Sequence, residues 1–200
     1  MNDDIFLETI EEIDKARENG LYMLALMGSL VLIDSCAKVE YPKIKGNKER
    51  YIKWYNKYIC NREYYNTPDL RNEIGEEPSR ITGEVVYTLR CSLLHEDNPN
   101  IQVSKIKKDR DKINDFVILI EEKNNMDIYT ETWDINWKYD ENGKPFVTNR
   151  QYVFNLQRFC WVVLKICTDY YKKHKDKFFF DYKLLDMKNW RGFRVSEFYI

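Results

Sequence analysis

The longest apolar stretch of the chain, residues 21–39, limits its possible folds more than any other feature. Asp34 and Lys38 interrupt its second half, so no uninterrupted apolar run reaches the roughly 18 residues that a membrane span needs. The simplest interpretation is a helix buried in a protein core. We therefore predict a core helix from Leu21 to about Glu40, ended by Pro42, and no membrane association.

Size and charge narrow the class of protein. The 200 residues favour a single domain that is large enough to bury a core. Acidic and basic side chains almost cancel, and the formal charge of -1 argues against a protein coated with cations for nucleic-acid binding. A local basic cleft remains compatible with this charge.

The cysteines and histidines indicate where the protein works and what it binds. The five cysteines, an odd number, form no Cys-x-x-Cys pair, and no secretory leader is evident, so we expect a reducing, cytoplasmic location. Only two histidines are present, far apart in the sequence, which gives no pattern for structural zinc. We expect neither a metal nor another cofactor.

Helical patterns flank the core helix on both sides. Four further helices are expected, at residues 2–19, 49–59, 80–96 and 149–173. Ser79 is a suitable N-cap for the central one, residues 80–96. The inward side chains of the last helix are expected to be Phe154, Leu156, Phe159, Cys160, Val163, Ile166, Cys167 and Tyr170.

Between the central and last helices the pattern changes to that of β-strands. Residues 115–120 read as an apolar strand, and residues 127–138 alternate between two faces. Residues 140–144 contain a turn signal before a short segment at 145–147. We predict a mainly α chain with a small β-hairpin insertion. A single domain, residues 1–200, would then have its helical core at about 1–98 and 149–173, the β-containing insertion at about 115–148 and a C-terminal tail at 174–200.

The central helix carries two reactive side chains, Arg90 and His95. Arginine has a fixed positive charge that grips phosphate, and histidine is the side chain best suited to transfer protons near neutral pH. An Arg-x4-His pair therefore has the minimum equipment for cutting an RNA backbone without a metal. The rest of the sequence offers no comparable group of residues.

The geometry of a helix makes it difficult for Arg90 and His95 to contact the same phosphate. Arg90 and His95 are about 140° apart around the axis of a straight helix. They can act on one phosphate if the arginine stem reaches round and the helix frays, or if a second copy packs across a dimer axis. Core-facing positions are expected to be Val85, Val86, Leu89 and Leu93, and polar-face positions Glu84, Thr88, Cys91, Ser92 and His95.

An ordinary structural interpretation of both residues stays open. Arg90 can be a solvated flank residue whose stem lies along the core, and His95 can be a helix-end histidine stabilised by the helix dipole. Asp34 is costly inside an apolar helix unless it is paired, so we expect it to contact Arg90 or Arg50.

A second candidate surface combines basic and aromatic side chains in residues 43–58. Arg50, Tyr51 and Lys53 belong to a pattern typical of surfaces that stack bases and contact the phosphates of single-stranded nucleic acid. The favoured alternative is that Tyr51 and the other large aromatic residues of this stretch pack inward, while the lysines only solubilise the protein.

Three blocks of the sequence resemble one bacterial branch of the HEPN-like proteins. The run Gly83 to Glu96 is similar to the motif helix of that superfamily, whose pattern is Arg-x4-6-His. Residues 32–42 (LIDSCAKVEYP) and 50–55 (RYIKWY) resemble further segments of that branch, in the same order. The resemblance covers the first half of the chain, and the second half matches only in outline.

The resemblance implies an antiparallel bundle of four to five helices, in a homodimer whose two motifs meet in a cleft. It also implies an RNA-acting protein, often a metal-independent ribonuclease of toxin–antitoxin, abortive-infection or other phage-defence systems, with an antitoxin or other regulatory partner. Arg90 would then polarise the phosphate, and His95 would act as general acid or base. Supporting roles would fall to Asp34, Glu84, Tyr87 and Ser92, and RNA contacts to Arg50, Tyr51 and Lys53.

One residue departs from the pattern of the nuclease members. The position after the arginine is commonly polar in them, often Asn or Asp, whereas here it is Cys91. This favours the alternative of a non-catalytic HEPN-like module that binds a nucleotide, RNA or a protein. A third alternative is a purely structural dimer in which Arg90 and His95 only bridge the subunits.

Overall fold

The computed structural model describes residues 4–60, 81–96, 115–120, 129–131, 136–149 and 151–179. This part of the chain is mainly helical, as predicted. Its five α-helices are α1 (Ile5–Glu18), α2 (Tyr22–Glu40), α3 (Asn47–Tyr55), α5 (Gly83–Glu96) and α6 (Leu156–His174). A π-helical turn, η1 (Asn56–Cys60), continues α3, and a 3-10 turn, η5 (Lys175–Lys177), follows α6.

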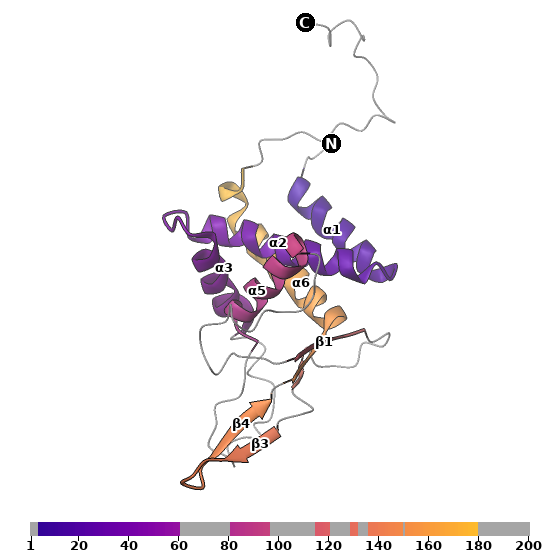
Figure 1. Ribbon diagram of the computed structural model, residues 1–200. Helices are drawn as coiled ribbons and strands as arrows, with labels where there is room; N and C mark the ends of the chain where they lie inside the picture. Colours follow the sequence, from indigo (N-terminus) through magenta and orange to yellow (C-terminus); the bar gives the residue numbers. More distant parts are fainter. Residues whose placement is uncertain are drawn as a thin grey trace, which may run out of the picture.

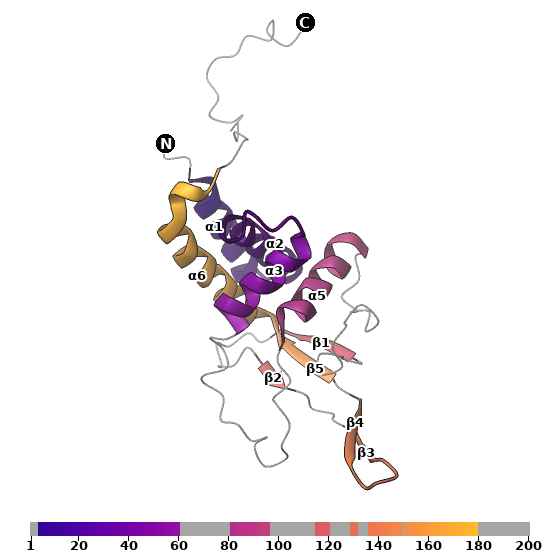
Figure 2. The ribbon, with the colours of Figure 1, turned by 90° about the vertical axis from the view of Figure 1, so that its left-hand side faces the viewer.

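Helix α2 is the centre of the fold. It packs against α1, α3, α5 and α6, and both ribbon views show it among them (Figures 1 and 2). Leu26, Leu30 and Ile33 of α2 are completely buried, so the predicted core helix is confirmed. By length and composition alone, with a mean hydropathy of 1.5, α2 would also pass for a membrane span, and 44% of that apolar window is buried inside the fold.

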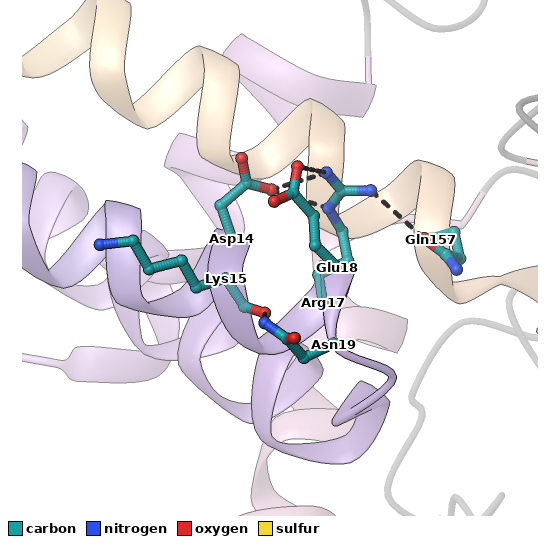
Figure 3. A network of polar contacts seen from close by, with 6 residues as sticks. All are labelled: Asp14, Lys15, Arg17, Glu18, Asn19 and Gln157. Atoms are coloured by element: carbon teal, nitrogen blue, oxygen red, sulfur yellow. Dashed lines mark hydrogen bonds and ion pairs between the residues drawn. The ribbon is translucent and has the colours of Figure 1, made fainter.

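Arg17 ties the end of α1 to the start of α6 (Figure 3). Its guanidinium lies 2.7 Å from Asp14 and 3.6 Å from Glu18, and its Nη1 donates to Oε1 of Gln157 at 3.2 Å. The Arg17 side chain is only 13% exposed. Salt screens such shielded ion pairs less than exposed ones. The hydrogen bond from Arg17 to Gln157 therefore starts from a firmly held side chain and helps to fix the angle between the two helices.

Glu40 joins three elements at the end of α2. Its Oε1 accepts hydrogen bonds from Lys57 Nζ at 2.6 Å and from the Tyr58 hydroxyl at 2.9 Å, and its Oε2 accepts from the Tyr170 hydroxyl at 2.8 Å. The donors come from η1 and α6. Burial opposes ionisation of Glu40, but the hydrogen bonds from Lys57, Tyr170 and Tyr58 outweigh it and lower its pKa.

The strands lie at one end of the helical group (Figures 1 and 2). The central strand of the larger sheet is β5 (Gln151–Asn155), which pairs in parallel with β1 (Asp115–Leu119) and antiparallel with β2 (Tyr129–Glu131). A separate antiparallel pair consists of β3 (Asn136–Tyr139) and β4 (Pro145–Asn149), with the turn at residues 140–144 between them. Strand β5 runs directly into α6.

The sequence predicts the last helix from residue 149, and this is wrong at its start. Residues 151–155 form β5, in which the strand-favouring Tyr152 and Val153 pair with β1. Helix α6 begins only at Leu156, capped by Asn155, whose Oδ1 accepts from the backbone N–H of Arg158 at 3.0 Å. Phe154 therefore lies in a strand, whereas the other expected inward residues are buried in α6: Leu156, Phe159, Cys160, Val163, Ile166, Cys167 and Tyr170.

The strand predicted at residues 127–138 is also wrong as a single element. Residues 129–131 and 136–139 belong to different sheets, β2 and β3. Residues 132–135 between them lie outside the described part of the chain, as does the N-cap predicted at Ser79.

Candidate functional site

Helix α5, which carries the Arg-x4-His motif, begins against the backbone of α3. The Gly83 N–H donates to Oδ1 of Asn56 at 2.7 Å, and Thr82 Oγ1 accepts from the N–H of Val85 at 3.5 Å. A Cβ on Gly83 would lie 2.7 Å from the carbonyl oxygen of Ile52, closer than atoms of these types can approach. Glycine at this position therefore permits the close contact that fixes where α5 starts.

One face of α5 packs into the core as predicted. Val85, Val86, Leu89 and Leu93 are at most 3% exposed. The predicted polar face is wrong at two positions, because Thr88 and Ser92 are buried as well. Thr88 Oγ1 donates to the carbonyl oxygen of Glu84 at 2.8 Å, which allows a hydroxyl to sit inside. Ser92, a predicted supporting residue, is enclosed in the core beside the site.

The guanidinium of Arg90 is held by Asp34 of α2. Arg90 Nη2 lies 2.5 Å from Asp34 Oδ2, and the two side chains are 14% and 17% exposed. The expected pairing of Asp34 is confirmed, and its partner is Arg90. Arg90 is thus neither a freely solvated flank residue nor sealed in the core, but a shielded cation at the edge of the fold.

Burial and charge oppose each other in this pair. Burial raises the pKa of Asp34, against the opposing effects of Arg90, Asn47 and Arg50. For Arg90, burial disfavours the charge, but the Asp34 carboxylate outweighs it and raises the pKa further. Arg90 therefore remains a cation throughout the physiological pH range.

Two cations from different helices lie near the ring of Tyr87. The centroid of its ring is 5.7 Å from Arg90 Cζ and 5.9 Å from Lys48 Nζ. The buried ring of Tyr51 meets it edge-on, with the centroids 5.3 Å apart. Lys48 Nζ also lies 3.3 Å from Glu84 Oε1, and the Lys48 side chain is 41% exposed. We call Lys48, Tyr87 and Arg90 the cationic surface of α5.

Lys48 is one of the basic residues of the stretch 43–58, but its place beside the motif helix is not predicted from the sequence. It belongs to α3, and no spacing within residues 80–96 indicates that it reaches the motif helix. Only the packing of α3 on α5 brings it there. The signal available in the sequence is limited to the basic character of residues 43–58.

The structure separates the three residues predicted to contact RNA. Tyr51 is completely buried, which confirms the inward-packing interpretation and leaves its ring no surface on which a base could stack. Lys53 is exposed and pairs with Glu49 at 2.7 Å. Arg50 donates to the carbonyl oxygen of Ile44 at 3.0 Å, so part of its guanidinium holds the turn before α3.

His95 lies in the last turn of α5, and its side chain is outside the described part of the structure. Cys91, one turn earlier, is partly buried. The described residues include no group of three or more His, Cys, Asp or Glu side chains that could hold a metal ion. The arrangement can bind an anion through Arg90 and Lys48, and a proton-transfer step would fall to His95.

No family model, curated protein or solved structure matches the chain.

Proposed function

We propose that the protein is an RNA-acting HEPN-like protein, and specifically a metal-independent endoribonuclease that uses Arg90 and His95. The observation that supports this most directly is the cationic surface of α5. Lys48 of α3 and Arg90 of α5 lie 5.9 Å and 5.7 Å from the centroid of the Tyr87 ring. His95 follows Arg90 by five residues on α5. Two cations beside an aromatic ring suit a phosphate and its attached nucleoside.

The proposed reaction needs only these side chains and the RNA itself. The ribose 2′-hydroxyl attacks the adjacent phosphorus, and the bond from phosphorus to the 5′-oxygen of the next nucleotide breaks. The products are a 2′,3′-cyclic phosphate and a free 5′-hydroxyl. His95 takes the proton of the attacking hydroxyl or gives one to the leaving oxygen, and Arg90 stabilises the negative charge on the phosphoryl oxygens.

The ion pair with Asp34 is compatible with this role. A guanidinium has five N–H donors, and the contact of Arg90 with Asp34 is made by Nη2. Because the Nε atom of Arg90 is buried, the N–H groups of Nη1 and Nη2 would have to bridge the carboxylate and the phosphate. Asp34 would then orient Arg90, at the cost of weakening its attraction for RNA.

We further propose that the working unit is a homodimer in the cytoplasm. Within one straight helix Arg90 and His95 are about 140° apart, so a partner's motif helix would supply the second group without fraying of α5. An antitoxin or another regulatory partner would restrain such an activity in the cell. Phage defence and toxin–antitoxin systems are the settings that this activity suits.

The test is cleavage of single-stranded RNA by the purified protein in EDTA. The expected products carry cyclic phosphate and 5′-hydroxyl ends, and His95→Ala should abolish the cleavage. The matched control is His174→Ala, which removes the other histidine of the chain from the end of α6. Cleavage that survives His95→Ala, or that His174→Ala abolishes equally, would exclude the proposed mechanism.

A second function, a non-catalytic module that binds RNA, a nucleotide or a protein, is favoured by one observation. Asp34 already neutralises Arg90, whose side chain is only 14% exposed. In this case the wild-type protein should retard RNA in a gel shift at 50 mM salt without any product after long incubation. Arg90→Gln should weaken the retardation, whereas His95→Ala should leave it unchanged.

A further inference from the structure

The outer face of α6 carries cations that no described carboxylate neutralises. The exposed or partly exposed residues along it include Arg158, Lys165, Lys172 and Lys173, against one carboxylate, Asp169. Four cations and one anion give this face a charge of +3, although the whole chain has a formal charge of -1. The positive charge of α6 is therefore a local feature.

The cations of α6 differ from most cations on the other helices in having no carboxylate partner among the described residues. Several arginine or lysine side chains of α1, α3 and α5 are held by carboxylates, as Arg17 is by Asp14, Lys53 by Glu49 and Arg90 by Asp34. Among the described residues of the other helices, Lys38 of α2 and Arg50 of α3 have no such ion pair, but they lie singly, whereas α6 carries four such cations. None of the four cations on α6 forms an ion pair with another residue in the part of the chain that the structure describes. They are left available for an anion from outside.

An exposed tryptophan lies in the middle of these cations. Trp161 is 41% exposed, which is unusual for so large an apolar side chain. The Arg158 Cζ atom lies 4.6 Å from the centroid of its ring and the Lys165 Nζ atom lies 5.0 Å from it. Cation–π contacts at exposed sites are weak, so the flexible Lys165 can leave the ring when a better partner arrives.

We propose that the outer face of α6 binds single-stranded nucleic acid. A base stacks on Trp161 in place of Lys165, and the flanking phosphates contact Arg158 and Lys165. Lys172 and Lys173 extend the path of positive charge along the helix, since Arg158 and Lys172 are about 21 Å apart at 1.5 Å per residue. A positive groove or stripe with an aromatic platform is the usual design of surfaces that hold single strands without reading their sequence.

This surface is distinct from the cationic surface of α5. In both ribbon views α5 and α6 lie on opposite sides of α2, one in front and one behind in Figure 1, and right and left in Figure 2. The α6 surface includes none of the motif residues, so the inference does not depend on the proposed ribonuclease activity. The outer face of α6 would hold single-stranded nucleic acid without cutting it.

A protein partner is the competing occupant, because tryptophan and arginine are also common at the centres of protein interfaces. The charge pattern favours nucleic acid. Four cations that no carboxylate of the described residues pairs are spread along one helix and match a repeating row of phosphates, whereas a protein interface core is usually depleted of charge.

The test uses fluorescence anisotropy of a labelled oligothymidylate, which lacks the 2′-hydroxyl and so cannot be cut by the proposed reaction. The wild-type chain should bind it at 50 mM salt, more weakly as salt rises. Trp161→Ala should weaken binding by roughly 5- to 100-fold, and Trp161→Phe should retain most of it. The double variant Arg158→Gln/Lys165→Gln should lower the slope of log K against log salt by about 1.4, at about 0.7 per phosphate contact.

The matched control is Lys15→Gln on α1, which removes one charge from a side chain that is 70% exposed. It should bind as tightly as wild type, and circular dichroism should show that every variant is folded. The proposal is overturned if wild type does not bind at 50 mM salt, if the α6 variants bind like wild type, or if Lys15→Gln loses as much affinity as they do.

Discussion

Arg90 and Asp34 join the motif helix to the core helix through one ion pair, with 2.5 Å between Nη2 and Oδ2. Both side chains are largely shielded from water, at 14% and 17% exposed. The same contact holds α5 on α2 and neutralises the cation that would bind phosphate. Under the proposed function, the stability of the fold and the binding of phosphate are therefore coupled at Arg90, and substitutions on either side of the pair should change both.

The first prediction concerns Asp34→Asn, which removes the charge and keeps the volume. The free energy of unfolding should fall by about 1–3 kcal/mol, because a partly buried arginine loses the charged acceptor of its hydrogen bond. Burial already raises the pKa of Asp34, so the loss comes mainly from the unpaired Arg90 and not from the missing carboxylate. Urea denaturation followed by circular dichroism measures the difference. If the proposed function is correct, RNA should also bind more tightly, since Arg90 no longer shares its charge.

A double variant distinguishes the contribution of the ion pair itself from the cost of leaving one charge unpaired. Replacement of both residues, by Asp34→Leu with Arg90→Met, should cost less than Asp34→Asn alone, because no unpaired charge remains in the partly buried site. The control is Lys53→Gln, which breaks an exposed pair with Glu49, side chains 51% and 58% exposed. Exposed pairs contribute about 0–1 kcal/mol. A double variant that is less stable than Asp34→Asn would show that the ion pair itself stabilises the fold.

The second prediction concerns the acid stability of the α2 end. Glu40 has a lowered pKa because the hydrogen bonds from Lys57, Tyr170 and Tyr58 outweigh its burial. Its stabilising contribution is therefore complete above the unfolded-state pKa of about 4.3 and is lost as the pH falls through the lower folded-state pKa. Glu40→Gln should lower the free energy of unfolding at pH 7 by about 1–3 kcal/mol.

The pH dependence identifies the cause of that loss. The difference between wild type and Glu40→Gln should be largest near pH 7 and should shrink below pH 4, in urea titrations at a series of pH values. Glu49→Gln, which removes an exposed carboxylate, should change stability by less than about 1 kcal/mol at pH 7. A Glu40→Gln deficit that stays constant from pH 7 to pH 3 would mean that packing, and not ionisation, is responsible.

Much of the helical core follows from the sequence because apolar spacing reports which side of a helix is buried. The core helix α2 and the buried face of α5, with Val85, Val86, Leu89 and Leu93, follow directly from that spacing. The pairing of Asp34 follows from the cost of an unpaired carboxylate in an apolar helix. These predictions depend on local pattern and on one simple energetic rule.

The features that the sequence does not predict depend on contacts between segments that are distant in the chain. Periodicity alone does not separate a strand at residues 151–155 from the helix that follows it, because the parallel partner β1 is more than thirty residues away. Thr88 and Ser92 look polar, but the neighbouring helices bury them. Lys48 reaches Tyr87 only because α3 packs on α5. Each of these is a tertiary contact with no local signal.

The third prediction tests the contact that positions the motif helix. A Cβ on Gly83 would lie 2.7 Å from the carbonyl oxygen and 2.8 Å from the Cα of Ile52, and backbone atoms cannot move aside as a flexible side chain can. Gly83→Ala should therefore push α5 away from α3 and lower the free energy of unfolding by about 1–3 kcal/mol. Because the shift would carry Tyr87 away from Lys48, RNA binding at the cationic surface of α5 should weaken as well. Gly46→Ala is the control for steric contact, since its Cβ would meet nothing closer than 3.9 Å. Because Gly46 is the N-cap of α3, this variant should lose about 1 kcal/mol through the weaker cap alone, and less than Gly83→Ala. Equal unfolding midpoints for the two variants in urea would contradict the close approach of α5 to α3.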